Sequence, residues 1–220
     1  MTYQELKDIF VTACHEQHAC TDGFKEVLAA DNAGMLAMAM RHHWDDCYNG
    51  IFFDALKNNI NNFTDFINDF AGAGIYINHS STHGIVIVSN NTEKISVHGD
   101  AECYAFGKCY VDVFENAQLY CKVSDSVILL DDKATAFLEN QHGSVIKGNS
   151  TANLINCKDI ICFNRPYIRA KDSSINAYEF YRIETSGTTN VSIYGNTAIT
   201  PDNAKNYNLI LNDDSKITFK

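Results

Sequence analysis

The sequence contains no uninterrupted apolar run that approaches the roughly 18 residues a membrane-spanning helix needs. Its first ten residues place Glu5, Lys7 and Asp8 in an amphipathic pattern, so the basic and then apolar segments of a secretory signal are also absent. These two absences leave no visible signal for export or membrane insertion. We therefore expect a cytoplasmic protein with no membrane partner.

Basic residues are scarce, since 17 Lys and Arg stand against 27 Asp and Glu and give a net charge of −10. Phosphate recognition needs clustered Lys and Arg, so this balance argues against direct binding of nucleic acid. The excess of acidic residues is unevenly distributed along the chain. Residues 1–73 contain 11 acidic and 4 basic residues, and the remainder contains 16 acidic and 13 basic residues. The N-terminal third is the acidic part of the chain.

Common catalytic motifs are also missing: there is no phosphate-binding glycine loop, no Gly-x-Ser-x-Gly turn and no His-Glu-x-x-His helix. No catalytic residue is therefore assigned. The 8 cysteines are spread through a chain of 220 residues without an export signal. Reduced, mostly buried thiols explain them better than disulfides do.

The first 73 residues show the spacing of amphipathic helices. Thr2 and Glu5 have the spacing of a capping box, and the apolar residues that follow predict a helix over residues 3–18. Thr21-Asp22-Gly23 breaks this helix and can cap a short second one. A third helix follows around Met35–Met40, and Asn49-Gly50 can end it. The same periodicity continues to Gly72, which predicts a helical domain over residues 1–73.

After Gly74 the apolar period changes from 3.6 to 2. Alternating apolar pairs then recur at a step of eight with one step of nine: Cys103 and Ala105, Val111 and Val113, Leu119 and Cys121, Ile128 and Leu130, Ala136 and Leu138. Turn residues such as Gly99-Asp100-Ala101 separate them. The phase is disturbed over residues 141–156 and returns at Ile160.

A β-meander and a β-solenoid could both use this pattern. The Asn-Gly and Asp-Gly pairs that hairpins favour are almost missing from this part of the chain, whereas a small residue at one phase of every turn is expected in a solenoid. We predict an α+β protein with segregated parts: a helical domain over 1–73 and a β-solenoid over 74–220, with two or three eight-residue units per coil. The helices can cap one end, and the ends could also support oligomers.

Two helical pairs form the best candidate for a metal site. Cys14 with His18, and His43 with Cys47, each have i, i+4 spacing, and two Cys with two His make a possible structural zinc set. The more common explanation of such a pair is a buried Cys beside an exposed His. Apart from this possible zinc, we expect no cofactor. The segment His42-His43-Trp44-Asp45-Asp46 could bind a metal or supply a general base. A helix end with solvated charges and a docked Trp explains it more simply.

Candidate partner-binding residues are charged side chains in two regions. The acidic candidates belong to the helical part, and the basic ones form the only suggestion of a cationic row along the solenoid. Solvated surface charge is the alternative for both groups. The candidates are Asp45, Asp46, Asp54, Asp65, Asp69, Arg165, Arg169 and Arg182.

Residues Thr2–Lys7, the segment Ala19–Gly23 and the Ala-x-apolar-x-small repeat together resemble uncharacterised small proteins encoded by phages and prophages of gut Bacteroidetes. The resemblance covers both parts of the chain. It implies an accessory role in dealing with a bacterial host, in whose cytoplasm the protein would act. That family has no assigned functional residues to carry over.

Three functions follow as hypotheses. The first is a non-enzymatic interaction protein, such as a phage-encoded inhibitor of CRISPR or another bacterial defence system, which binds a host protein. The second is a virion or surface component whose solenoid binds carbohydrate through tyrosines, for example Tyr104, Tyr120 and Tyr178. The third is a metal-dependent enzyme that uses the segment from His42 to Asp46.

Overall fold

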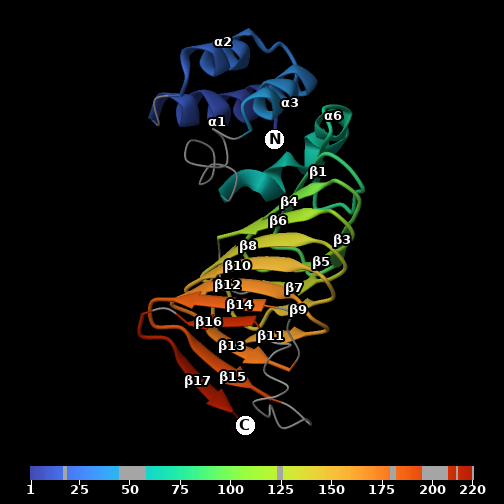
Figure 1. Ribbon diagram of the computed structural model, residues 1–220. Helices are drawn as coiled ribbons and strands as arrows, with labels where there is room; N and C mark the ends of the chain where they lie inside the picture. Colours follow the sequence, from blue (N-terminus) through green and yellow to red (C-terminus); the bar gives the residue numbers. More distant parts are fainter. Residues whose placement is uncertain are drawn as a thin grey trace.

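The computed structural model describes residues 1–16, 19–44, 58–122, 126–178, 182–194, 208–211 and 213–219. An N-terminal group of helices is followed by a stack of parallel strands in two sheets (Figure 1). This arrangement confirms the prediction of a segregated α+β fold with a β-solenoid.

Five helical elements make up the described part of the N-terminal region, which we call the helical cap. They are α1 (Tyr3–Glu16), α2 (Thr21–Ala29), α3 (Ala33–His42), the 3-10 helix η2 (Ile60–Phe66) and α6 (Ile67–Gly72). The predicted capping box is present, because the Thr2 N–H donates to Glu5 Oε2 over 2.7 Å and the Glu5 N–H donates to Thr2 Oγ1 over 3.2 Å. The expected stop at Asn49-Gly50 lies outside the described residues. None of the helices in the described ranges is long and apolar enough to cross a membrane.

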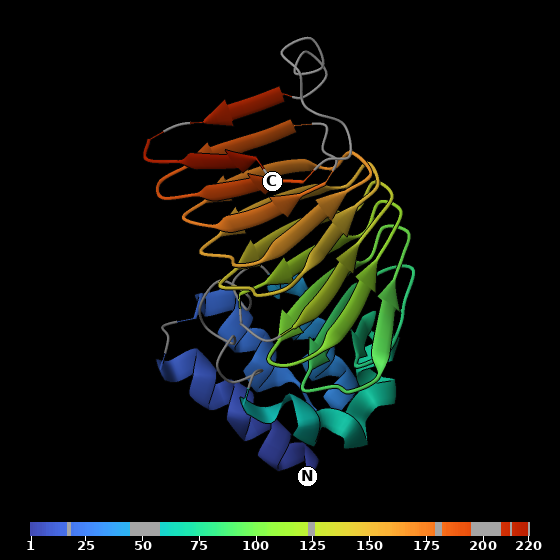
Figure 2. The same cartoon turned by 90° about the horizontal axis from the view of Figure 1, so that it is seen from below.

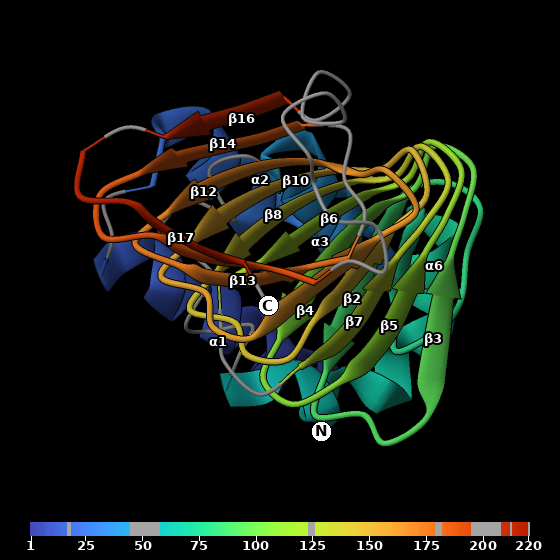
Figure 3. The same cartoon turned by 60° about the horizontal axis from the view of Figure 1, so that its bottom comes forward.

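The strands alternate between the two sheets along the chain, even-numbered strands in one and odd-numbered strands from β3 onward in the other, with β1 joining the even sheet. The even sheet contains β1 (Ile75–Ile77), β2 (Ile85–Ser89), β4 (Glu102–Phe106), β6 (Gln118–Cys121), β8 (Thr135–Glu139), β10 (Thr151–Ile155), β12 (Tyr167–Lys171), β14 (Arg182–Ser186) and β16 (Asn208–Leu211). The odd sheet contains β3 (Lys94–Val97), β5 (Tyr110–Val113), β7 (Val127–Leu130), β9 (Val145–Lys147), β11 (Ile160–Phe163), β13 (Ser174–Ala177), β15 (Asn190–Ile193) and β17 (Lys216–Phe219). Figures 2 and 3 show the resulting stack from below and obliquely.

Each coil contains two strands, which settles the choice between two and three units per coil. Glu102 pairs in parallel with Gln118, and Thr135 pairs with Thr151, so a position returns to the same side after sixteen residues or close to it. Sixteen residues are two of the eight-residue units that the sequence shows. Two described pairs have a longer step: β14 with β16, where Arg182 pairs with Asn208, and β15 with β17, where Asn190 pairs with Lys216.

The interior of the solenoid is formed by the inward-facing residues of both sheets. The predicted apolar pairs are buried, from Cys103 and Ala105 on β4 to Ala136 and Leu138 on β8, and they belong to one continuous cluster that extends to Ile193. Period-two alternation places one face of every strand in this core. Each rung therefore buries its apolar residues against the rungs on both sides.

The corners of the coil are turned by residues with positive φ. At one corner these are Gly99, Glu115, Asp132, Gly148 and Asn164, spaced by sixteen or seventeen residues. Glycine, and to a lesser degree Asn and Asp, tolerates this left-handed conformation, which explains the turn residues that recur in the sequence. The Gly99 position is also crowded, since a Cβ atom there would lie 2.4 Å from the Thr82 carbonyl oxygen.

The repeat continues without interruption through residues 141–156, where the sequence pattern is disturbed. The strands β9 and β10 occupy this stretch and keep the sixteen-residue register with their neighbours. The pattern is obscured because Gln141, Ser144 and Ser150 are buried polar residues at corners of the coil. Polarity is therefore a poor guide to burial at these positions.

The helical cap packs against the outer face of the first strands of the even sheet (Figure 1). All five residues of β2 are buried, with Val86 and Val88 inside the solenoid and Ile85 and Ile87 among the helical side chains. Tyr104 and Phe106 of β4 join the same cluster. The helices therefore cover the end and part of one side of the stack, and the two regions share one apolar cluster.

Candidate functional site

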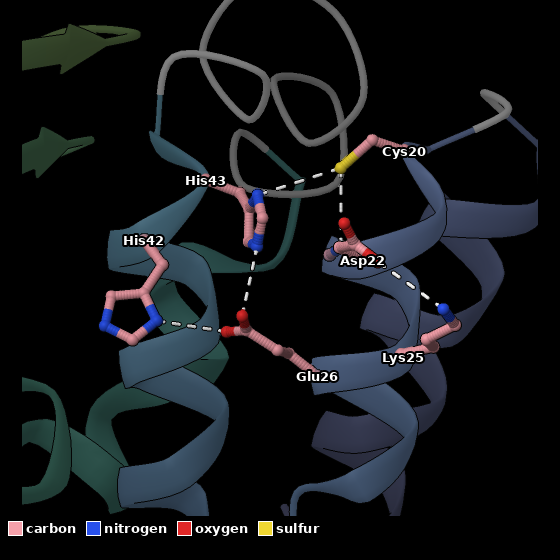
Figure 4. A network of polar contacts seen from close by, with 7 residues as sticks. Cys20, Asp22, Lys25, Glu26, His42 and His43 are labelled. Atoms are coloured by element: carbon pink, nitrogen blue, oxygen red, sulfur yellow. Dashed lines mark hydrogen bonds and ion pairs between the residues drawn. The ribbon is translucent and has the colours of Figure 1, made fainter.

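The most concentrated set of chemically active side chains lies between α2 and α3. Cys20 is the N-cap of α2, with extended backbone angles, and its Sγ accepts a hydrogen bond from the Gly23 N–H over 3.4 Å. His42 is the last residue of α3, and His43 is its C-cap. Figure 4 shows these residues facing one another across the helix pair. We call Cys20, Glu26, His42 and His43 the α2–α3 cluster.

Glu26, on α2, links the two histidines. Its Oε2 lies 3.0 Å from His42 Nδ1, and its Oε1 lies 3.5 Å from His43 Nε2. Hydrogen bonding from His42, with a smaller contribution from His43, lowers the pKa of the Glu26 carboxyl despite slight desolvation. The carboxylate therefore binds the His42 imidazole, and its contact with His43 is longer: His43 Nε2 is buried and forms no hydrogen bond with any described residue.

The thiol and the His43 ring are in contact. Cys20 Sγ lies 3.7 Å from His43 Nδ1, while the other ring nitrogen faces Glu26. Gly23 makes room for this arrangement, because a Cβ atom there would lie 3.1 Å from Cys20 Sγ and 3.2 Å from His43 Cγ. Cys20 is exposed, and it is the only exposed cysteine in the described part of the chain.

This geometry places a thiol, an imidazole and a carboxylate in the order of a nucleophile, a general base and a group that orients the base. At the helix terminus the Gly23 N–H donates to the sulfur, and the N–H groups at the start of a helix stabilise negative charge. The same residues do not form a metal site, since no group of three or more His, Cys, Asp or Glu among the described residues could hold a metal ion.

The proposed zinc ligands are only partly described. Cys14 is buried on α1, and burial raises its thiol pKa to about 11. His43 contacts Cys20 and Glu26. His18 and Cys47 lie outside the described residues, so the zinc set stays a prediction.

The segment from His42 to Asp46 is also only partly described. Trp44 is buried and meets the Tyr104 ring edge-on at 4.8 Å, as expected for a Trp docked on the core. Asp45 and Asp46 lie outside the described residues. His42, His43 and Trp44 line a pocket of about 510 Å³ together with Arg41 and, from the solenoid, Gly84, Ile85, Asp100 and Glu102.

The acidic candidates on the later helices are exposed where they are described. Asp65 Oδ2 lies 2.7 Å from the Met1 amino nitrogen, and Asp69 is exposed on α6. Asp54 lies outside the described residues.

Two of the three arginine candidates lie on the outer face of the even sheet. Arg169 on β12 contacts the Tyr167 hydroxyl at 2.7 Å and Glu184 Oε2 at 3.3 Å, and Arg182 on β14 pairs with the other oxygen of Glu184. Both guanidinium groups lie over the Tyr167 ring. Arg165 is exposed at a corner with a φ of 69°. Arg169 and Arg182 therefore share the negative charge of Glu184, so the net positive charge of this surface is lower than the three arginines alone would give.

The sequence patterns did not indicate Cys20 or Glu26 as site residues. An i, i+4 pair joins residues within one helix, whereas Cys20 and His43 are 23 positions apart and meet only because α2 packs on α3. One local signal was present: Cys20 directly precedes the first turn of the second helix, where a thiol can act as a cap. The N-cap of the second helix is therefore Cys20, the residue before the Thr21-Asp22-Gly23 segment that the sequence indicated.

Comparisons of the chain with protein-family models, with curated protein sequences and with solved structures found no match.

Proposed function

We propose that the protein is an interaction module that binds a basic surface of a host protein through its helical cap. The observation that carries this proposal is the exposure of the negative charge. Every acidic residue in the described part of the cap is exposed: Glu5, Asp8, Glu16, Asp22, Glu26, Asp31, Asp65 and Asp69. A surface of one sign attracts a surface of the opposite sign and speeds their encounter.

The cations of the described cap neutralise little of this charge. The Lys7 ammonium donates to the carbonyl oxygens of Leu28 and Ala30 at 2.7 and 2.6 Å, and Arg41 donates to the Gly74 carbonyl at 2.8 Å. Two cations pair with acids: Lys25 with Asp22, where both side chains are strongly exposed, and the Met1 ammonium with Asp65. Lys7 and Arg41 thus fix the helices in place instead of pairing with carboxylates.

The partner that this charge favours is a protein with a basic nucleic-acid-binding channel. We therefore extend the proposal to a phage-encoded inhibitor of a bacterial defence system such as CRISPR, whose acidic cap occupies a channel built for a polyanion. The solenoid would serve as a rigid support, because its inward positions are filled by the core and its coils repeat in register.

The alternative of carbohydrate binding gains little from the aromatic residues. Tyr104, Tyr120 and Phe137 occupy equivalent outward positions on β4, β6 and β8 and stack at centroid distances of 4.9 and 5.1 Å. Tyr178 and Tyr194 stack in the same way at 5.0 Å. A sugar ring stacks on an aromatic face, and here neighbouring rings cover the faces between them. Carbohydrate binding stays the second candidate function, and only at Phe137, the exposed ring at the end of the row.

The proposal is tested by plating phage on a bacterial host with an active CRISPR system that expresses the protein. We expect wild-type protein to restore plaques and the variant Glu16→Lys/Asp31→Lys/Asp69→Lys to lose this protection. The matched control Glu93→Lys/Glu139→Lys/Asp214→Lys makes the same change of charge on the solenoid and should keep it. No protection by the wild type, or equal loss in both variants at equal expression, would overturn the proposal.

A further inference from the structure

The α2–α3 cluster has a geometry that charge-driven binding does not require. We infer that Cys20 is a catalytic nucleophile for acyl transfer from esters or amides, with His43 as its general base and Glu26 as the residue that positions His43. This inference goes beyond the interaction proposed above and does not depend on it.

The first argument is the order of contacts around the His43 ring. One nitrogen faces the thiol at 3.7 Å and the other faces the Glu26 carboxylate at 3.5 Å (Figure 4). The Glu26 carboxylate forms no hydrogen bond with Nε2 in this structure, so it acts on the ring through its charge, which favours a proton on Nε2 and leaves Nδ1 to accept the proton of the thiol. Contacts of this length are common before a substrate is bound and shorten in the reacting complex.

The second argument is the position of the thiol at a helix terminus. The Gly23 N–H donates to the sulfur and the Phe24 N–H donates to the Cys20 carbonyl at 3.0 Å. Thr21 and Asp22 add the remaining N–H groups of the first helical turn, which have no partner within a helix. Negative charge that develops on sulfur, or on the oxygen of a bound carbonyl, is stabilised at such a terminus.

The third argument concerns access. Cys20 is exposed, unlike the other described cysteines, and its partner His43, though not Cys20 itself, lines the pocket of about 510 Å³ between the cap and the solenoid. Asp100 and Glu102 line the solenoid side of this pocket. Arg41 lines the cap side, so the lining holds two carboxylates and one guanidinium, and this excess of negative charge favours an acyl substrate that carries a cationic group, such as the acyl side of a lysine residue.

The reaction follows from these positions. His43 Nδ1 takes the thiol proton as Cys20 Sγ bonds to the carbonyl carbon, and the C=O electron pair moves to oxygen. When this pair returns, the bond to the leaving group breaks and the leaving group takes the proton from His43. Water then attacks the thioester and gives its proton to His43. The C–S bond breaks, the carboxylic acid leaves, and the proton returns to sulfur.

The test uses the full chain with p-nitrophenyl esters of N-acetyl-lysine and N-acetyl-norleucine, which differ in the cationic group. We expect a burst of one p-nitrophenolate per protein, a stable thioester on Cys20 in acid-quenched peptide maps, and faster acylation by the lysine ester. His43→Gln should lower the acylation rate constant about 10²- to 10⁴-fold. Cys20→Ser should remove the thioester, and Cys14→Ser, outside the cluster, should leave the burst unchanged.

Glu26→Gln separates a positioning role from a structural one. It should slow acylation by a smaller factor and change the pH profile of the rate, while thermal unfolding stays close to that of the wild type. A burst that is equal in wild type and His43→Gln, or acylation spread over several residues, would overturn the inference. Should His43→Gln fail to fold, alkylation of wild-type Cys20 by iodoacetamide decides: a rate equal to that of free cysteine at every pH contradicts an activated thiol.

Discussion

The helical cap and the solenoid place the same residue type in different surroundings. Cys20, in the cap, is exposed and faces an imidazole, whereas Cys14 of the cap and the five described cysteines of the solenoid are buried. Burial raises the thiol pKa of Cys103 and Cys157 in the solenoid. Every rung repeats its neighbour, so an inward position there can hold only a side chain that fits the stack. The cap is not repeated, and its positions can be unique. Candidate chemistry therefore lies in the cap.

The largest change in stability is expected when a core side chain is truncated in each region. Leu119 on β6 and Leu36 on α3 are both fully buried, and Leu→Ala at such sites typically costs about 2 to 5 kcal/mol through lost burial and the cavity that remains. We expect both variants in this range in urea unfolding. Leu28→Ala is the control, because Leu28 is 50% exposed, and it should change stability by less than about 0.5 kcal/mol. A cost below that limit for Leu119→Ala would contradict the continuous solenoid core.

Glycines at the corners give a second test. Gly99→Ala should cost about 1 to 3 kcal/mol, because φ is +61° and the new Cβ would lie 2.4 Å from the Thr82 carbonyl oxygen. Gly143→Ala has a φ of +74° with open space around the Cβ, so it should cost about 1 kcal/mol from backbone strain alone.

The control for both is in the cap. Gly72→Ala meets nothing within 4 Å and has no positive φ, so it should be neutral or slightly stabilising. Thermal unfolding of the three variants gives the order. The assignment of corner strain would be wrong if Gly72→Ala were the most damaging of them.

Helix capping gives a smaller effect that is confined to the cap. Asn32 Oδ1 accepts a hydrogen bond from the Met35 N–H over 3.0 Å at the start of α3. Asn32→Ala should therefore lower stability by about 1 kcal/mol, measured by urea unfolding, while Asn32→Asp keeps the acceptor and most of the stability. Equal losses in the two variants would show that the cap hydrogen bond does not matter.

The smallest effect is expected from a carboxylate of the solenoid. Partial burial opposes ionisation of Asp131, but the Lys147 ammonium at 2.7 Å and the Asp132 N–H outweigh it and lower the carboxyl pKa from its ordinary 3.8. A lowered pKa in the folded state stabilises the fold above the unfolded pKa and loses that contribution as the pH falls through the folded value. Asp131→Asn should therefore slightly lower the melting temperature at pH 7 and have less effect below about pH 3.

The neighbouring Asp132→Asn is the control for that prediction, because Asp132 is exposed and Asn also tolerates its left-handed φ of 55°. Its melting temperature should follow that of the wild type from pH 7 to pH 3. A parallel shift of both variants at all pH values would contradict a role for the Asp131–Lys147 ion pair.

The inward faces of the solenoid could be predicted from the sequence because burial in a strand follows a local alternation. Val111 and Val113 are buried where the period of two places them. The disturbed stretch was misleading because Gln141 and Ser144 are polar and still buried, since the corner they occupy is closed by the rungs on either side. Polar side chains are usually exposed, but at these two positions the packing of the repeated rungs buries them.

The sequence by itself determined the order of helices and strands, the eight-residue unit and the acidity of the cap, because each depends on neighbours along the chain. Tertiary structure alone decided that two units make a coil, since the pairing of Glu102 with Gln118 joins residues on successive rungs. It also decided that Cys20 meets His43 beside Glu26, because that contact depends on how α2 packs against α3. A spacing of 23 residues has no periodic signal, so only the packing of the helices could reveal it.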